Sequence, residues 1–206
     1  MKSELEFDKM HFSVLQEIGS IGAGNAATAL STLIGRKVDM KIPKIQFLDF
    51  QQTGEALGGA EIPVAAVLIT VNSENVNGIM MFIVEMEKTA KLVSSIMGVQ
   101  PENISELGKM ERSALREIGS ILTANYIGVL ATLLGIEIDR SVPSLAIDMS
   151  GAILSLPATE FAKVADKTLF IESVFYSDED DVSGYFIFVP DQNSFKFIFE
   201  KLGLDI

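Results

Sequence analysis

The sequence predicts an α+β protein built from two copies of one helix–strand unit. A long helical pattern opens each half of the chain, short strands joined by hairpin turns follow it, and a second helix closes each half. Helices and antiparallel strands that occur in separate blocks are typical of the α+β class. We expect a single domain over residues 1–206, with internal repeats at approximately 7–98 and 107–206.

The repeat is visible in the letters themselves. "SVLQEIGSIGAGN" (Ser13–Asn25) returns 100 residues later as "SALREIGSILTAN" (Ser113–Asn125). Between residues 13–43 and 113–143, 14 of 31 positions are identical without gaps, which is far above chance. A period near 100 residues is too long for a solenoid repeat. The sequence therefore indicates an internal duplication, and a pseudo-two-fold arrangement is its natural outcome.

Each unit begins with a long helix followed by a strand. Apolar residues recur at helical spacing before Gly35 and again before Gly135, and each glycine is placed to end its helix as a C-cap. Alternation in the following segments, "KVDMKIP" and "IEIDRSVP", predicts a strand with one buried side.

A hairpin and a closing helix complete each unit. The second copy also carries "DMSGAILS", whose extra length predicts a short additional helix over Asp148–Ser155. The predicted hairpin strands are Val64–Val71 with Gly78–Val84, and Thr168–Tyr176 with Tyr185–Val189; the predicted closing helices are Lys88–Met97 and Ser194–Leu202.

Composition excludes several classes of function. The net charge of −12 repels nucleic-acid phosphates and anionic membrane surfaces, and suits a soluble protein or a basic protein partner. Cysteine is absent, which excludes disulfides and thiol catalysis, and His11 is the single histidine. The longest apolar run, "IPVAAVLITV", is about half of a membrane span. The acidic start does not resemble a signal peptide, so we expect a cytoplasmic protein without membrane insertion.

Two short motifs have unremarkable explanations. "GAGNAA" (Gly22–Ala27) resembles a dinucleotide-binding fingerprint, but that fingerprint follows a strand, whereas here a helical pattern runs through it. Close packing of helices explains the small residues better. "SDEDD" (Ser177–Asp181) lacks the glycine and terminal glutamate of a calcium-binding EF-hand loop, and a solvated hairpin tip explains it better. No metal site is expected.

A carboxylate and a hydroxyl recur together in both copies. Glu17 and Ser20, like Glu117 and Ser120, stand three residues apart in a predicted helix and therefore share a face. The apolar positions must face the core, which leaves each pair on or near the exposed side. One explanation is inheritance of two surface residues by duplication. Against it, many neighbouring positions changed while the pairs did not.

The phrases "EIGSIGAGNAATALSTLIGRKVDMKIP", "SALREIGSILTANYIGVLATLLG" and "DMSGAIL" closely resemble the CheC family of chemotaxis proteins, which also includes CheX and the phosphatase part of FliY. The resemblance covers almost the whole chain. It implies hydrolysis of the aspartyl phosphate of CheY, the regulator of the flagellar motor. In this family a helix crosses the CheY active site, a Glu engages the regulator's lysine, and an Asn three residues later positions the attacking water. CheY supplies the Mg²⁺, so no cofactor of the chain's own is implied.

The resemblance assigns the glutamate role to Glu17 and Glu117, but the asparagine positions hold Ser20 and Ser120. Serine is shorter and has one hydroxyl where an amide offers separate donor and acceptor groups. Three accounts stay open: an active phosphatase with a water-positioning serine, an engineered double Asn→Ser change, or a non-catalytic adaptor that binds phosphorylated CheY or CheD. A structural part of the flagellar switch is a weaker alternative.

The family also binds CheD, a receptor deamidase. The resemblance places that contact at "DMSGAILS", with Asp148 as the key residue. A simpler explanation is that Asp148 caps the short helix, since Asp is a good N-cap. Both roles are compatible, and CheD binding is independent of the serine positions.

Overall fold

The computed structural model describes residues 9–41, 43–97, 107–160, 168–176, 181–201 and 203. The same order of elements occurs in both halves, consistent with the predicted duplication. The first half contains α1 (Lys9–Ile34), β1 (Asp39–Met40), β2 (Lys44–Leu48), α2 (Phe50–Ala56), β3 (Pro63–Asn72), β4 (Gly78–Glu85) and α3 (Met86–Met97). The second contains α4 (Lys109–Leu134), β5 (Asp139–Arg140), β6 (Ser144–Met149), α5 (Ser150–Glu160), β7 (Thr168–Tyr176), β8 (Asp181–Pro190) and α6 (Gln192–Lys201).

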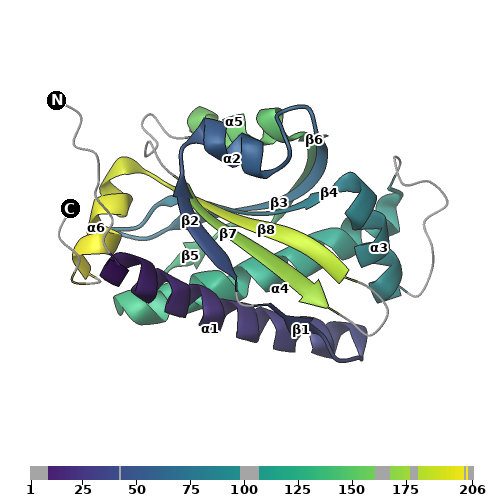
Figure 1. Ribbon diagram of the computed structural model, residues 1–206, viewed down its shortest axis with the longest axis horizontal. Coiled ribbons are helices and arrows are strands. Elements are labelled where there is room, and N and C mark those ends of the chain that lie inside the picture. The colour runs from purple at the N-terminus through teal and green to yellow at the C-terminus, as the bar shows by residue number, and fades with distance from the viewer. Residues whose placement is uncertain are drawn as a thin grey trace.

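The fold has three layers, and the predicted α+β class is confirmed. One eight-stranded antiparallel sheet forms the middle layer. The two long helices α1 and α4 cover one of its faces, and the short helices α2 and α5 cover the other (Figure 1). The closing helices α3 and α6 lie at opposite ends of the sheet (Figure 1).

The two halves exchange their edge strands. The hairpin β3–β4 and the hairpin β7–β8 join through β4 and β8, where Phe82 pairs with Phe186. Strand β2 of the first half pairs with β7 of the second, while β6 of the second half pairs with β3 of the first. The order β1-β7-β8-β4-β3-β5, with β2 beside β7 and β6 beside β3, reads alike from both ends. Each half therefore depends on the other to cover its own hairpin.

The strand predicted in each of the segments 37–43 and 136–143 is only two residues long, and a longer strand that was not predicted follows each segment. Met40 ends β1 and Lys44 begins β2, with Pro43 between them, and Pro143 lies between β5 and β6 in the same way. Proline has no N–H to donate to a ladder, so it interrupts pairing at this point. Both glycine caps are confirmed, with φ of +70° at Gly35 and +63° at Gly135.

The second copy carries a helix close to the predicted position, but the prediction that this helix distinguishes it from the first copy is wrong. Helix α5 begins at Ser150, two residues later than predicted, and α2 occupies the matching place in the first half. The two differ in length, with 7 residues in α2 and 11 in α5. Asp49 caps α2 through a capping box: its side chain accepts from the Gln52 backbone N–H at 2.8 Å, and the Gln52 side chain accepts from the Asp49 backbone N–H at 3.1 Å.

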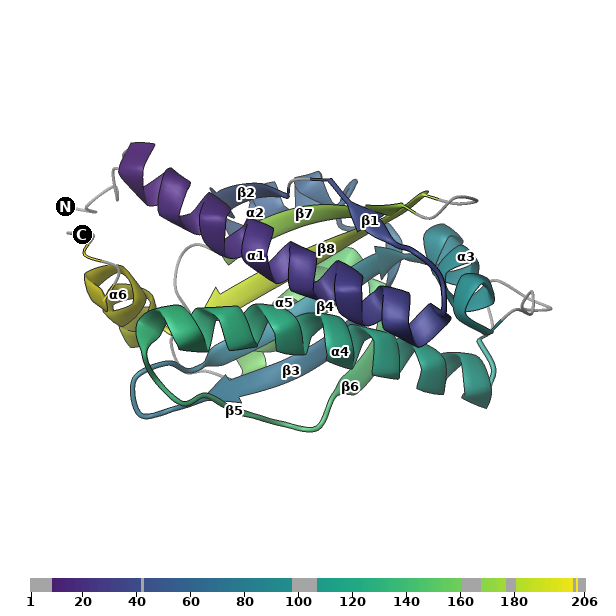
Figure 2. The same cartoon turned by 90° about the horizontal axis from the view of Figure 1, so that it is seen from below.

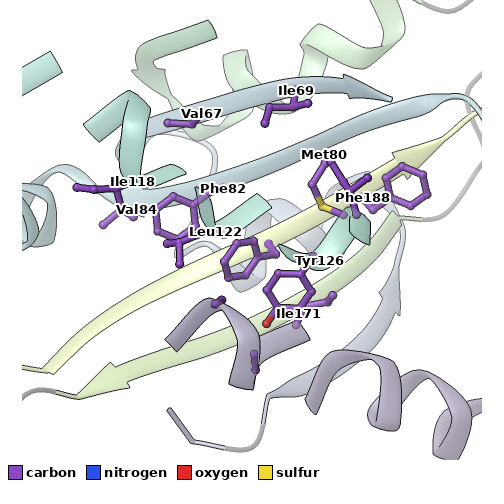
Figure 3. Close-up of a cluster of buried hydrophobic side chains, with 14 of the residues drawn as sticks. Val67, Ile69, Met80, Phe82, Val84, Ile118, Leu122, Tyr126, Ile171 and Phe188 are labelled. Atoms are coloured by element: carbon purple, nitrogen blue, oxygen red, sulfur yellow. The ribbon is translucent and has the colours of Figure 1, made fainter. Parts of the chain in front are cut away.

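The central strands are buried on both faces, which explains the apolar run "IPVAAVLITV". Val67 faces the core beneath α1 and α4, and its neighbour Leu68 faces the core beneath α2 and α5. A sheet covered on both sides reads as a continuous apolar stretch rather than an alternating one. Phe82, Leu122 and Tyr126 lie in the core beneath α1 and α4 (Figure 3). Burial of each such side chain stabilises the fold by about 1.5–3 kcal/mol.

Helices α1 and α4 run antiparallel and side by side (Figure 2). A Cβ atom at Gly22 of α1 would lie 2.6 Å from Cδ1 of Tyr126 on α4, so glycine permits this approach. "GAGNAA" lies within α1, as helix packing predicted. Helix α4 is long and apolar enough to cross a membrane by length and composition alone, but half of that stretch is buried inside the protein. Its apolar character is therefore accounted for by packing in the core.

Candidate functional site

The outer side of α1 presents Glu17 and Ser20 to solvent, as their spacing predicted. The two residues between them explain this orientation. Ile18 is 5% exposed in a cluster with residues of α4 and α6, and Gly19 packs against Ile45 and Pro43. Because residues three apart share a helix face, the carboxylate and the hydroxyl project together away from the core.

The Ser20 hydroxyl is held by its own helix. It donates a hydrogen bond to the carbonyl oxygen of Gln16 at 2.7 Å. This bond uses the only hydrogen of the side chain, so the remaining capacity of the oxygen is to accept. Ile21, next in sequence, is an exposed hydrophobic side chain at 44%. The outer side of α1 thus offers a carboxylate, an acceptor oxygen and an apolar contact.

Ser20 also lies at one end of a groove along α1. The groove has a volume of about 510 Å³. Ser20, Gly24 and Thr28 line its helical wall, and Lys37 and Lys41 are among the residues lining the facing wall. Residues 20, 24 and 28 lie on one side of the helix, so the groove runs along α1 from Ser20 toward the C-terminal end of the helix.

The second copy presents the same pair differently. Glu117 is exposed, as predicted, but Ser120 is half-buried. The Thr123 hydroxyl donates to the carbonyl oxygen of Gly119 at 2.6 Å and, at the longer distance of 3.2 Å, to that of Ser120. The matching groove along α4 has a volume of about 340 Å³ and is lined by Asn125, Arg140 and neighbouring small or apolar residues, without Ser120. The two pairs are therefore alike in sequence but not in surroundings.

The asparagines further along the helices do not join the serines. The Asn125 amide donates to the carbonyl oxygen of Ile121 at 2.8 Å and is half-buried. Asn25 is exposed, five residues beyond Ser20. Five residues rotate a helix by about 500°, which is one full turn plus about 140°. Each asparagine therefore projects from a different side of the helix than its serine.

Asp148 lies away from both pairs, at the end of β6 where the chain enters α5 on the opposite face of the sheet. Its side chain is exposed and accepts from the Met149 backbone N–H at 2.7 Å. The predicted capping role is wrong, because Asp148 does not directly precede the helix: Met149 stands between Asp148 and the first helical residue. Met149 is itself 53% exposed. Asp148 is thus an accessible carboxylate beside an exposed apolar side chain.

A buried hydrogen bond behind the helices was not foreseen from the sequence. The hydroxyls of Tyr126 on α4 and Ser173 on β7 lie 3.1 Å apart. Burial raises the pKa of Tyr126 to about 12, and the bond to Ser173 opposes that rise in part. The Tyr126 residue is 2% exposed, and its ring packs against that of Phe186 at a tilt of 39°, with ring centroids 4.3 Å apart. This contact joins α4, which carries the second pair, to β7 in the core.

The acidic groups in the described part of the chain do not gather into a metal site. Within the described residues, no group of three or more His, Cys, Asp or Glu side chains could hold a metal ion. The motif "SDEDD" falls largely on residues 177–180, which lie outside the described residues, as does the side chain of His11.

Sequence comparisons with known proteins agree on one family. The model of the CheC-like family matches residues 10–45 and 110–147, which contain both Glu–Ser pairs. The chain is 31% identical over 197 residues to the CheY-P phosphatase CheC of Bacillus subtilis (strain 168), an alignment that covers 94% of each protein. It is 28% identical over 140 residues to the flagellar motor switch phosphatase FliY of the same organism, which covers 67% of this chain and 36% of FliY.

The fold is shared with a solved structure. The crystal structure of Thermotoga maritima FliY superposes with a TM-score of 0.72 at 21% identity, covering 97% of this chain and 98% of that one. The similarity to Bacillus subtilis CheC runs over nearly the full length of both proteins. This chain therefore belongs to the CheC-like family.

Proposed function

We propose that this protein is a chemotaxis regulator of the CheC type, which dephosphorylates the aspartyl phosphate of CheY. The single observation that carries the proposal is that α1 and α4 each present an exposed glutamate followed three residues later by a serine. These pairs lie in the two segments that match the family, and the full-length relative from Bacillus subtilis is named a CheY-P phosphatase. Cytoplasmic action on a soluble regulator fits the acidic surface.

In this proposal one long helix lies across the active site of CheY. Glu17 or Glu117 engages the regulator's active-site lysine, and Ile21 supplies an apolar contact next to the first pair. The serine oxygen accepts a hydrogen bond from a water and holds it in line with the phosphorus. The water oxygen then bonds to phosphorus while the bond to the aspartate oxygen breaks, giving free carboxylate and inorganic phosphate. CheY supplies the Mg²⁺, and this chain contributes positioning.

One observation favours a second candidate, a non-catalytic adaptor for phosphorylated CheY. Because the Ser20 hydrogen is committed to Gln16, the side chain can accept from a water but cannot also donate toward the phosphate. Serine is also shorter than asparagine, and a water misplaced by about 1 Å costs about a hundredfold in rate. The glutamate contacts would survive this loss, so binding would outlast catalysis.

A separate proposal concerns CheD. Asp148 and Met149 form an exposed acidic and apolar corner at the start of α5. This corner is on the face of the sheet opposite α1 and α4 (Figure 1). The protein could therefore hold CheD and CheY at the same time on its two faces.

The test of the leading proposal is the decay of Mg²⁺-loaded CheY-phosphate with and without this protein. Faster decay that disappears in the Glu17→Ala/Glu117→Ala double variant supports the phosphatase. Unchanged decay together with binding to the phosphorylated regulator supports the adaptor. No binding at all would contradict both.

A further inference from the structure

The two Glu–Ser pairs project from the same side of the molecule. Helices α1 and α4 together cover one face of the sheet (Figure 1), and they lie side by side when that face is viewed directly (Figure 2). Both glutamates are exposed, whereas Ile18 and Ile118, which follow them in sequence, are buried. A partner that docks on either pair therefore approaches this chain from the same direction.

The contact between the two helices sets the distance between the pairs. A Cβ atom at Gly22 would meet the Tyr126 ring, so these two residues lie at about the same level. The glutamate of α1 stands five residues before Gly22, and that of α4 stands nine residues before Tyr126. Because the helices are antiparallel, these offsets point in opposite directions and amount to 14 residues, or about 21 Å along the helices. With the axes of packed helices about 8–10 Å apart, the glutamate backbones are about 23 Å from each other.

A docked protein domain needs more room than this separation gives. A stable interface covers about 800 Å² on each partner, which is a disc about 32 Å across. A domain of about 100 residues has a radius of gyration of about 13 Å, which makes a compact sphere about 34 Å across. Two such domains, each centred on one pair on the same side of this chain, would overlap in volume and in the surface that they cover.

We propose that the two sites are mutually exclusive, so that one molecule binds one phosphorylated receiver at a time. This inference rests on the proposed function and adds to it the stoichiometry and a negative coupling between the pairs. The duplicated pair then offers the same partner a second way to dock, and does not hold a second partner.

Exposed residues between the pairs belong to both docking surfaces. Asn25 is exposed and stands eight residues after Glu17. By the Gly22–Tyr126 contact, its level on α4 is six residues after Glu117. Asn25 is thus about 12 Å along the helices from one glutamate and about 9 Å from the other, inside a disc of about 16 Å radius around either.

The first experiment counts bound receivers. CheY loaded with Mg²⁺ and beryllofluoride is titrated by calorimetry, and the mass of the complex is measured by light scattering. We expect one receiver per chain for the unaltered protein, for Glu17→Ala and for Glu117→Ala, and no tight binding for the double variant. Because exclusive sites add their association constants, the fractions of the original constant that the two single variants retain should add up to the whole. Glu61→Ala, an exposed acidic residue outside the long helices, is the control and should retain full affinity.

The second experiment tests the shared surface. In Glu117→Ala the receiver uses the first pair, and in Glu17→Ala it uses the second. Adding Asn25→Trp should weaken binding about fivefold or more in both backgrounds, because a bulky side chain clashes with a partner on either site. Ala56→Trp, at an exposed position of α2 on the opposite face, should change the affinity less than about twofold. An unchanged melting temperature of each variant shows that the fold is intact.

The outcomes are distinct. If the unaltered protein does not bind the loaded regulator, the proposed function fails. If two receivers bind to one chain, or if Asn25→Trp acts in one background alone, the proposed function stands and the exclusion is wrong. The exclusion is also wrong if one single glutamate variant loses all binding and the other loses none, because then only one pair binds.

Discussion

The Ser20 hydroxyl donates to the carbonyl oxygen of Gln16 at 2.7 Å, so the residue that we propose positions the water is bonded back to its own helix. An asparagine there would reach further and carry a donor and an acceptor on separate atoms. We predict that Ser20→Asn/Ser120→Asn increases the hydrolysis of CheY-phosphate about a hundredfold, because it restores the placement of the water.

The matched control is Thr132→Asn. Thr132 is exposed on α4 and its hydroxyl donates to the Gly128 carbonyl oxygen at 2.8 Å, the same local arrangement at a position outside the site. It should leave the rate unchanged. Equal rates for the double asparagine variant and the unaltered protein would show that the residues at positions 20 and 120 do not position the water.

Two glycines of α1 should respond to alanine with opposite signs. A Cβ at Gly22 would lie 2.6 Å from the Tyr126 ring, which the core holds in place, so Gly22→Ala should destabilise the fold by about 1–3 kcal/mol. A Cβ at Gly24 meets nothing within 4 Å, so Gly24→Ala should stabilise the helix by about 0.5–1 kcal/mol. Urea unfolding of the two variants measures both effects. Stabilisation by Gly22→Ala would mean that the two long helices are further apart than described.

The buried pair of Tyr126 and Ser173 should behave as a unit. Tyr126→Phe leaves the Ser173 hydroxyl buried without this partner and should cost about 1–3 kcal/mol of unfolding free energy. Adding Ser173→Ala removes the stranded group, so the double variant should lose less than the sum of the two single changes. A double-mutant cycle by chemical denaturation gives the coupling, and strict additivity would show that the bond contributes nothing.

Tyr126 should also make stability depend on alkaline pH. Its pKa in the folded protein is raised to about 12 from the ordinary 10.0, so the unfolded chain loses this proton first. The stabilising contribution is complete below pH 10 and is lost as the pH rises toward 12, by about 2–3 kcal/mol in total. The stability difference between the unaltered protein and Tyr126→Phe should therefore shrink over that range. A constant difference would mean that Tyr126 ionises equally in both states.

Asp148 should affect CheD alone. Asp148→Lys reverses the charge of an exposed corner at the start of α5 and should abolish co-elution with CheD. The hydrolysis of CheY-phosphate should not change, because the Glu–Ser pairs lie on the opposite face of the sheet (Figure 1). Glu87→Lys, an exposed charge reversal on α3, serves as the control and should retain CheD. Persistent capture by Asp148→Lys would place the CheD contact elsewhere.

Local signals predicted the local parts of the fold well. The glycines at 35 and 135 stand at the C-caps of the long helices, and the burial of Ile18 turns Glu17 and Ser20 outward. Both predicted hairpins form, although β8 begins at Asp181, four residues before the predicted strand. Helix α2 was missed although its signal was present, since Asp49 and Gln52 have the spacing of a capping box. A helix of 7 residues is too short for periodicity to show.

The sequence by itself determined the α+β class and the helical face that carries each Glu–Ser pair, because periodicity and capping act over a few residues, and it predicted a duplication with which the order of the elements is consistent. Only the tertiary structure decided that β2 pairs with β7 and β6 with β3, since strand partners far apart in the chain are selected by how two faces bury together. The same long-range packing left Ser20 exposed at the end of a groove and Ser120 half-buried, although the two serines have nearly the same neighbours in sequence.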